Sequence, residues 1–331
     1  MDTNLTPAHD TDLQTAITPL RLVVAVGGNA LIQRGEIGTV EQQQEHANTA
    51  MAPVAQLARA GHHIVLTHGN GPIVGNILLR SEFARDLVSP MPLYIAGADS
   101  QGGIGYMLRT ALVNQLSMLD VQRGVIAMVT SVIVDSDDDA FGTPSKPIGP
   151  FYSAETAARL AEEQGWSFAD EPGRGSRRIV PSPAPVELVE AQEISRLAEQ
   201  GTIVIATGGG GVPTLRDESG LERGIDAVVD KDRASALLGT CIDADLLAII
   251  MEADAVYADW GTSSQRRLAE LTVTEAQALL DSDEFSAGTM APKIEAAVTF
   301  TGQTGNPTVI CSAESLQNAL AGEAGTRIVA G

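Results

Sequence analysis

Lysine is nearly absent from this sequence. Of its 21 permanent cations, only Lys146, Lys231 and Lys293 are lysines, and the rest are arginines. An ammonium group is a compact point charge, whereas a guanidinium is a wide planar fork. Each lysine lies in a stretch rich in glycine, proline, aspartate or serine. Codon bias and chance alone would scatter three lysines over the surface, so these local contexts indicate positions that need a compact cation against a crowded phosphate.

Basic charge, cysteine and long apolar runs are also scarce. The net charge of −21 argues against nucleic acid or an anionic membrane as a partner, because both bind basic surfaces. No apolar run approaches the ~20 residues of a membrane span. Cys241 and Cys311 are not spaced as a metal or redox pair. We therefore expect both cysteines in the core and the protein in the reducing cytoplasm.

The rest of the composition is typical of a globular protein, with 44% hydrophobic residues. Residues 1–19 are polar and acidic and lack a basic n-region, so we expect a loose tail there and no signal peptide. Residues 20–331 contain no Ser/Gly-rich linker, which favours a single domain.

Apolar strands alternate with helices along this domain. Such alternation is typical of a mostly parallel sheet that is covered on both faces. Residues 135–185 interrupt it with a proline-rich segment that holds one short helix near 154–164, and we expect a flap there. Elsewhere we expect strands over 20–26, 62–67, 125–134, 202–207, 244–251 and 308–311, and helices over 42–60, 72–85 and 103–119.

Three glycine-rich turns follow predicted strands, at 27–29, 69–71 and 208–211. Ligands bind outside the carboxyl ends of the strands in an open parallel sheet. Glycine lets the backbone approach an anion there, and the next helix offers free N–H groups. One such turn would be ordinary strand-to-helix geometry, but three of them favour an anion site.

Two familiar nucleotide-binding patterns are absent. None of the lysines lies in a GxxxxGK[ST] motif. Gly69, Gly71 and Gly75 form GxGxxxG, a loose variant of the dinucleotide spacing, but no following strand places an acidic residue for a ribose. We therefore do not expect a nicotinamide cofactor. The histidines show no spacing typical of a metal site or a catalytic dyad.

Two of the lysines lie where helices are expected to begin. Lys231 stands between Asp230 and Asp232, which fits either a capped helix start with solvated charges or an aspartate that orients a lysine beside a phosphate. Lys293 follows Pro292, a residue that favours the first turn of a helix. A cation there opposes the helix dipole unless an anion lies between the lysine and the helix. Lys146 lies in the flap, where it would by itself be read as a solvated loop residue.

Together these segments resemble carbamate kinase, within the amino-acid-kinase superfamily. The resemblance extends from about residue 20 to the C-terminus. It implies a three-layer α/β/α sandwich with an open, mostly parallel sheet and a protruding flap subdomain, usually in a homodimer. It also implies reversible phosphoryl transfer between ATP and carbamate, giving ADP and carbamoyl phosphate, with Mg²⁺ on the nucleotide phosphates and no metal ligand from the protein. The segments that carry it are 24–30, 67–72, 144–150, 174–183, 208–213, 229–235 and 292–297.

The resemblance implies roles for particular residues. Lys231 and Lys293 would contact the transferring phosphoryl group, Asp232 would orient them, and Lys146 would close over the carbamoyl end. Residues 20–222, with the flap at about 135–185, would form the carbamoyl-phosphate lobe, and 223–331 the nucleotide lobe. The small substrate's phosphate would bind at Gly27, Gly28, Asn29, Gly69, Asn70 and Gly71, and the nucleotide at Gly209, Gly210, Asp254, Tyr257 and Met290.

Some positions depart from the resemblance, and two alternatives stay open. Residues 251–263 keep Asp254 and Tyr257 but lack the threonine and the late lysine usual there, and Ser176 replaces a common tryptophan. These changes bear on base preference and nucleotide affinity. The alternatives are a kinase of the same fold for another small acid or phosphate, and a non-catalytic sensor of nucleotide or carbamoyl phosphate. Segment 144–150 argues against the first, and retention of all three lysines with Asp232 argues against the second.

Overall fold

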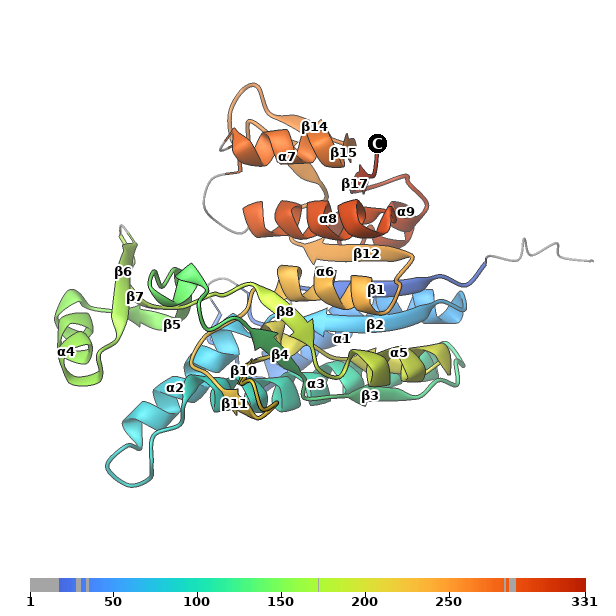
Figure 1. Cartoon of the computed structure of the whole chain (residues 1–331). Coiled ribbons are helices and arrows are strands. Elements are labelled where there is room, and N and C mark those ends of the chain that lie inside the picture. Colours follow the sequence, from blue (N-terminus) through green and yellow to red (C-terminus); the bar gives the residue numbers. More distant parts are fainter. Residues whose placement is uncertain (1–17, 28–30, 34–35, 172, 283, 286–289) are drawn as a thin grey trace, which may run out of the picture.

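The computed structural model describes residues 18–27, 31–33, 36–171, 173–282, 284–285 and 290–331. It confirms the predicted mostly parallel sheet (Figure 1). Among the described residues, only the last two strands of that sheet along the chain pair antiparallel. The strand order is β15 (Glu270–Thr272), β17 (Thr326–Val329), β16 (Thr308–Ser312), β12 (Leu246–Met251), β1 (Arg21–Val26), β2 (His63–His68), β9 (Ile203–Ile205) and β3 (Val125–Ala127).

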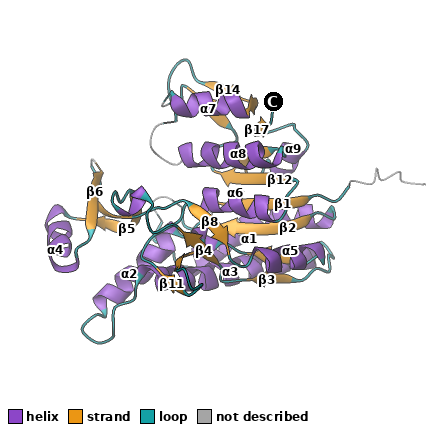
Figure 2. Ribbon diagram, in the orientation of Figure 1, coloured by secondary structure: helices purple, strands orange, loops and turns teal. Residues whose placement is uncertain are grey.

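Helices cover both faces of this sheet, which confirms the three-layer α/β/α class (Figure 2). Strand β1 alternates between the two cores: Leu22 and Val24 pack on one face, and Val23 and Ala25 on the other. Continuous apolar runs are needed because neither face meets water. One face is covered by α1 (Val40–Arg59), α3 (Leu93–Met118) and α9 (Leu316–Leu320), and the other by α5 (Ala191–Glu199), α6 (Lys231–Cys241), α7 (Val273–Asp281) and α8 (Ala291–Thr304).

The expected long strand over 125–134 is wrong, because the chain there forms two strands in different sheets. After β3 the backbone turns away, and β4 (Ser131–Val134) joins a second sheet. The cause is Gln101 on α3, whose amide brackets Thr130. Its Oε1 accepts from the Thr130 N–H at 3.0 Å, and its Nε2 donates to the Thr130 carbonyl at 3.0 Å. The second sheet has the order β11 (Glu222–Gly224), β10 (Val212–Arg216), β4 and β8 (Pro185–Leu188).

The expected helix over 103–119 is also too short. Helix α3 begins ten residues earlier, at Leu93, with Pro92 at its N-cap. Its first half contains four glycines, Gly97, Gly102, Gly103 and Gly105, which weaken its helical propensity and hide its start in the sequence. Packing of the buried face of α3 against the sheet compensates for them.

The predicted flap segment, residues 135–185, contains three strands and a helix that project from the body in Figure 1. Its three-stranded antiparallel sheet has the order β5 (Lys146–Tyr152), β7 (Gly175–Val180) and β6 (Ser167–Glu171). The predicted helix near 154–164 is α4 (Ala154–Gln164). Helix α2 (Gly71–Phe83) connects flap and body through an apolar cluster that includes Val74 and Leu78 of α2 and Ile148 and Val180 of the flap.

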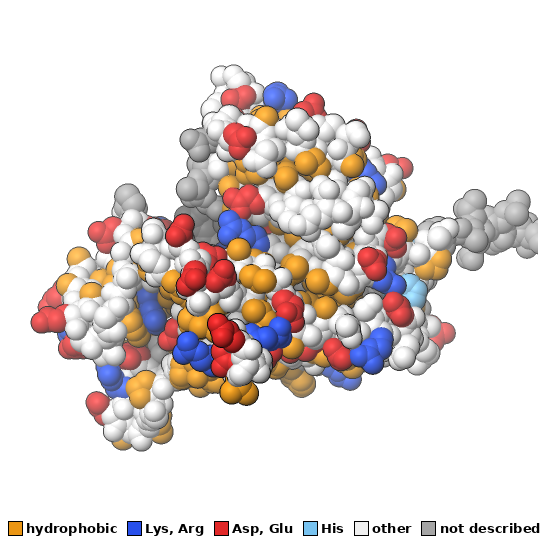
Figure 3. All heavy atoms as spheres, in the orientation of Figure 1, with side chains coloured by type: hydrophobic (Ala, Val, Ile, Leu, Met, Phe, Trp, Pro, Cys, Tyr) orange, Lys and Arg blue, Asp and Glu red, His pale blue; other side chains and the backbone are white. Residues whose placement is uncertain are grey.

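The cysteine prediction holds for one residue only. Cys311 is buried in β16, but Cys241, the last residue of α6, is exposed. Among the described residues, no helix combines the length and apolarity that a bilayer crossing requires. On the face drawn in Figure 3, acidic side chains are spread among basic and apolar ones, and basic side chains form no continuous patch.

Candidate active site

The predicted glycine turns meet at one edge of the sheet. Strands β1, β2 and β9 are parallel neighbours, so the turns that follow them lie side by side. The Gly69 N–H donates to the Val26 carbonyl at 3.0 Å and joins the first two turns. Gly27 follows β1 beside the end of β12. A β-carbon added to it would lie 3.5 Å from the Ile250 carbonyl oxygen. Gly28 and Asn29 lie outside the described residues.

The tetraglycine segment 208–211 packs against two other turns. A β-carbon on Gly209 would lie 2.1 Å from Asn70 Nδ2, and one on Gly210 would lie 2.2 Å from the Val229 carbonyl. Both glycines also have positive φ. No larger residue fits without displacing its neighbours, so these glycines bring β9, the Asn70 turn and the start of α6 together. Gly209, expected at the nucleotide, thus contacts the turn expected to hold the substrate's phosphate, whereas Gly210 contacts the segment that leads into α6.

Asn70 fixes the second turn at the N-terminus of α2. Its Nδ2 donates to Ser100 Oγ at 2.8 Å, and that hydroxyl donates to the Gly97 carbonyl at 2.6 Å. The Gly69 N–H is already hydrogen-bonded to the Val26 carbonyl. An anion at this turn would therefore be bound by the first turn of α2, which begins at Gly71. N–H groups there have no intrahelical acceptor, and they form the positive end of the helix dipole.

His68 adds no charge to this edge. The residue is buried, and burial lowers the pKa of its imidazole to about 4. Its Nδ1 lies 3.1 Å from the Gly69 carbonyl, which it donates to when neutral. The cationic charge of the site therefore comes from the lysines.

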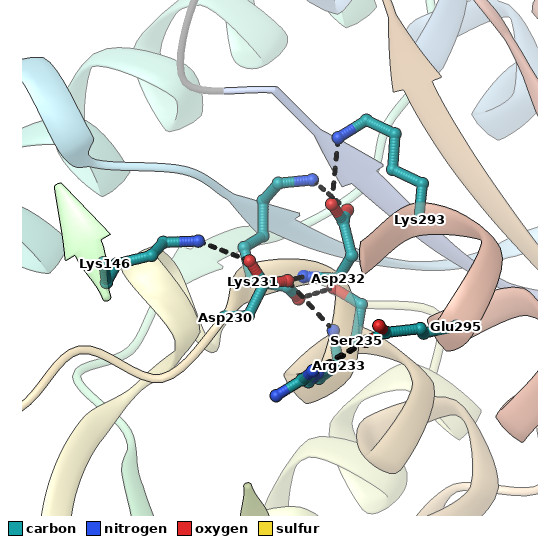
Figure 4. Close-up of polar contacts among 8 residues, drawn as sticks. All are labelled: Lys146, Asp230, Lys231, Asp232, Arg233, Ser235, Lys293 and Glu295. Atoms are coloured by element: carbon teal, nitrogen blue, oxygen red, sulfur yellow. Dashed lines mark hydrogen bonds and ion pairs between the residues drawn. The ribbon is translucent and has the colours of Figure 1, made fainter. Parts of the chain in front are cut away.

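All three lysines point toward the start of α6, although they come from three separate elements (Figure 4). Lys231 is the first residue of α6, Lys293 lies in the first turn of α8, and Lys146 is the first residue of β5. Lys293 Nζ donates to Asp232 Oδ2 at 3.0 Å, while Lys231 Nζ pairs with the other oxygen of the same carboxylate. Lys146 Nζ pairs with Asp230 Oδ2.

The electrostatics of this cluster suit a multiply charged anion. Burial by itself would raise the pKa of Asp232, but Lys231 and Lys293 outweigh it and hold that pKa below the usual range. Burial is likewise outweighed at Asp230, where Lys146 lowers the pKa of the carboxyl to about 2. Burial lowers the pKa of Lys231, although Asp232 opposes the shift. Three ammonium groups against two carboxylates leave excess positive charge beside the N-termini of α6 and α8.

Asp230 is the site residue that sequence reasoning left out. The predicted site gave the orienting role to Asp232 alone. Asp230 caps α6, because its Oδ1 accepts from the Asp232 N–H at 2.8 Å. Its other oxygen holds the flap lysine, 84 positions away in the chain. The Asp-Lys-Asp triplet was the available signal, since it places a carboxylate on either side of Lys231.

Buried hydroxyls and an ion pair hold α6 in place. Thr67 Oγ1, at the end of β2, lies 2.6 Å from Ser235 Oγ, and both residues are fully buried. Arg233 on α6 pairs with Glu295 on α8 at 2.6 Å. The two helices that carry Lys231 and Lys293 are therefore fixed to the sheet and to each other.

Three of the residues expected at the nucleotide, Asp254, Tyr257 and Met290, lie in the chain between β12 and α8. Tyr257, in the hairpin of β13 (Val256–Ala258) and β14 (Arg266–Leu268), donates its hydroxyl to Asp254 Oδ1 at 3.0 Å. Its ring meets Trp260 edge-on, with centroids 5.4 Å apart, and Trp260 is two-thirds exposed. Met290 directly precedes α8, the helix that carries Lys293. A partly exposed aromatic pair is suited to stacking on a base.

The described residues include no group of three or more His, Cys, Asp or Glu side chains placed to hold a metal ion. Both oxygens of Asp232 are engaged by lysines. Mg²⁺ is commonly held by substrate phosphates together with few carboxylates. The lysine cluster therefore fits a Mg²⁺ ion that is held by the phosphates of a ligand, and not one that is bound by protein side chains alone.

Comparison with known proteins identifies the family of the chain. The family model described as "Amino acid kinase family" matches residues 20–312. The chain is similar to the carbamate kinase of Pyrococcus horikoshii, at 42% identity over 94% of this chain and 99% of that one. The carbamate kinase of Staphylococcus epidermidis is 42% identical to this chain, over 93% of this chain and 99% of that one. Among solved structures, Giardia lamblia carbamate kinase bound to AMP-PNP is 38% identical, with a TM-score of 0.88 over 94% of this chain and 98% of that one.

Proposed function

This chain belongs to the amino acid kinase family, and on that premise we propose how its lysine cluster handles a phosphoryl group. Its activity is that of a carbamate kinase, an ATP-dependent phosphotransferase that exchanges a phosphoryl group between ATP and carbamate and so forms ADP and carbamoyl phosphate. We propose that the reaction serves to make ATP from carbamoyl phosphate.

The observation that carries the proposed mechanism is the convergence of three lysines on two aspartates. Phosphoryl transfer needs positioning and charge neutralisation more than covalent chemistry. Lys231 and Lys293 neutralise the equatorial oxygens of the transferring group, and Asp232, which both ammonium groups contact, holds them in place. The attacking oxygen of carbamate is already anionic, so no residue has to remove a proton.

The flap and the turns hold the two ends of the small substrate. Lys146 lies on the flap at Asp230 and closes over the carbamoyl end. The glycine turns after β1 and β2, with the first turn of α2, bind the phosphate through backbone N–H groups. Residues 20–222 thus form the carbamoyl-phosphate lobe and 223–331 the nucleotide lobe, with Asp254, Tyr257 and Met290 at the nucleotide.

We propose Mg²⁺ as the ion that accompanies the nucleotide. When bound, it would offset part of the negative charge of the nucleotide phosphates. This role is consistent with the donor set described above, in which the aspartates of the cluster are engaged by lysines.

The proposed function is tested by forming ATP from ADP, Mg²⁺ and carbamoyl phosphate, with luciferase detection. We expect ATP to accumulate with carbamoyl phosphate but not with acetylglutamyl phosphate or isopentenyl diphosphate as donors. Reaction with one of those donors instead would support another kinase of the same fold. Tight ADP binding without any ATP formation would support a sensor.

We also propose a homodimer in the cytoplasm. Strand β3 ends the main sheet, and a groove of about 460 Å³ lies between it and α3. Two apolar side chains of its lining, Tyr106 and Val129, are 63% and 52% exposed. An open sheet edge beside exposed apolar groups favours pairing with a second copy. Light scattering is expected to give twice the 34.5 kDa chain mass, and the mass of one chain would contradict the dimer.

A further inference from the structure

Helix α2 touches the flap through a backbone contact at Gly75. A β-carbon on Gly75 would lie 2.2 Å from the Cα atom of Gly149 and 2.7 Å from its nitrogen. Both are backbone atoms, so no side-chain rotation could relieve the overlap. The backbones of α2 and β5 therefore meet directly, and only glycine at position 75 allows this distance.

Gly149 is itself held in place by its neighbours. It has φ +71°, in the left-handed region, and the β5–β7 ladder changes register between Ile148 and Phe151. Arg177 on β7 donates from Nε to the Gly149 carbonyl at 2.9 Å. The irregular part of β5 is thus clamped from two sides, by β7 and by α2.

This contact lies close to the flap lysine. Lys146 is three residues before Gly149 on β5, and its partner across the ladder is Val180. Val180 and Ile148 are buried against Val74 and Leu78, which flank Gly75 on α2. A shift of β5 away from α2 would therefore carry the Lys146 ammonium away from Asp230.

We propose that Gly75 is a positioning residue for Lys146. One helix then serves both ends of the small substrate, because α2 begins at the glycine turn and contacts the flap one turn later. The third glycine of the GxGxxxG pattern is explained by this contact and not by a dinucleotide. The catalytic consequence rests on the proposed function of Lys146, whereas the positioning itself does not.

The scarcity of lysine makes the positioning directly measurable. Only three ε-amino groups exist in the chain, so reductive methylation followed by peptide mass spectrometry reports each one separately. We expect Gly75→Ala to raise the labelling rate of Lys146 several-fold, because the ammonium loses Asp230. Lys231 and Lys293, whose side chains are 11% and 13% exposed, should keep their slow rates.

A matched control is Gly103→Ala on α3, an exposed helical glycine whose β-carbon would meet nothing within 4 Å. It should leave all three labelling rates unchanged. If Gly75→Ala does not fold, Gly149→Ala perturbs the same segment differently: its β-carbon would lie at an ordinary 3.8 Å from the Gly75 Cα atom, but φ +71° strains the alanine backbone. It should raise Lys146 labelling to a smaller extent.

Kinetics separate positioning from catalysis. A displacement of about 1 Å at a reacting group can cost about 10²-fold, and we expect Gly75→Ala to lose kcat/KM for carbamoyl phosphate on that scale. The loss should resemble that of Lys146→Ala, and the double variant should be no worse than Lys146→Ala alone.

Unchanged Lys146 labelling in a folded Gly75→Ala protein would overturn the proposal, whatever the kinetics. Raised labelling supports it. Raised labelling together with unchanged use of carbamoyl phosphate would support the positioning role while refuting the proposed role of Lys146 in the reaction.

Discussion

Replacing Lys231 or Lys293 with alanine is expected to lower the turnover of ATP formation by about 10²- to 10³-fold in each case, the usual cost of losing one preorganised charged donor. Both ammonium groups contact Asp232, and both lie at helix N-termini where a phosphoryl group would sit. Each removal would leave part of the transition-state charge without a partner. Steady-state kinetics with ADP and carbamoyl phosphate measure the loss.

Lys231→Arg is expected to fail nearly as badly, although it keeps the charge. The Lys231 side chain is 11% exposed and its ammonium group contacts one carboxylate oxygen, so a planar guanidinium does not fit the same space. This variant separates compactness from charge, which no alanine substitution can do.

The control for these variants has to be an arginine, because the chain has no fourth lysine. Arg59→Ala removes an exposed cation at the end of α1 and should leave turnover unchanged. Near-normal turnover in Lys231→Ala or Lys293→Ala would remove the basis for the proposed mechanism.

Asp232→Asn is expected to destabilise the fold by about 3–5 kcal/mol, the range for breaking a buried ion pair by neutralising one partner. Asp232 is 3% exposed and contacts two ammonium groups, so the amide would remove the carboxylate charge that both of them contact. Because the folded-state pKa of Asp232 is depressed, its contribution to stability is present above the usual pKa of 3.8 and is lost as the pH falls through the lower, folded-state pKa. The destabilisation should thus be complete at pH 7.

Urea denaturation at pH 7 measures this difference in the free energy of unfolding. Asp120→Asn makes the same chemical change at an exposed position with φ 54°, which asparagine tolerates well, and should alter stability little. An Asp232→Asn protein as stable as the parent would show that the lysines do not depend on this carboxylate.

Sequence reasoning succeeded wherever the signal was local. The apolar runs of β1, β2 and β12 predicted a parallel sheet, because strands buried on both faces need continuous apolar residues. The helix starts at Lys231 and Lys293 followed from Asp230 and Pro292, which favour helix N-termini by their own chemistry.

The predictions that failed depended on tertiary packing, which the local sequence does not specify. The break after β3 is caused by Gln101, 29 positions before the threonine that it binds. The glycines of α3 hid its first ten residues, since packing and not propensity stabilises that helix. Cys241 is apolar enough for a core, but its place at the last residue of α6 leaves it exposed.

The amino-acid sequence by itself determined which groups this protein can use: three compact cations, glycine turns after strands, and carboxylates beside a lysine. Those properties depend on side-chain chemistry and on neighbours a few positions away. Tertiary structure decided which of these groups meet. Lys146 reaches Asp230 across 84 positions and Lys293 reaches Asp232 across 61, because the flap and α8 fold back onto the N-terminus of α6. Such distances depend on packing between elements, which no local pattern encodes.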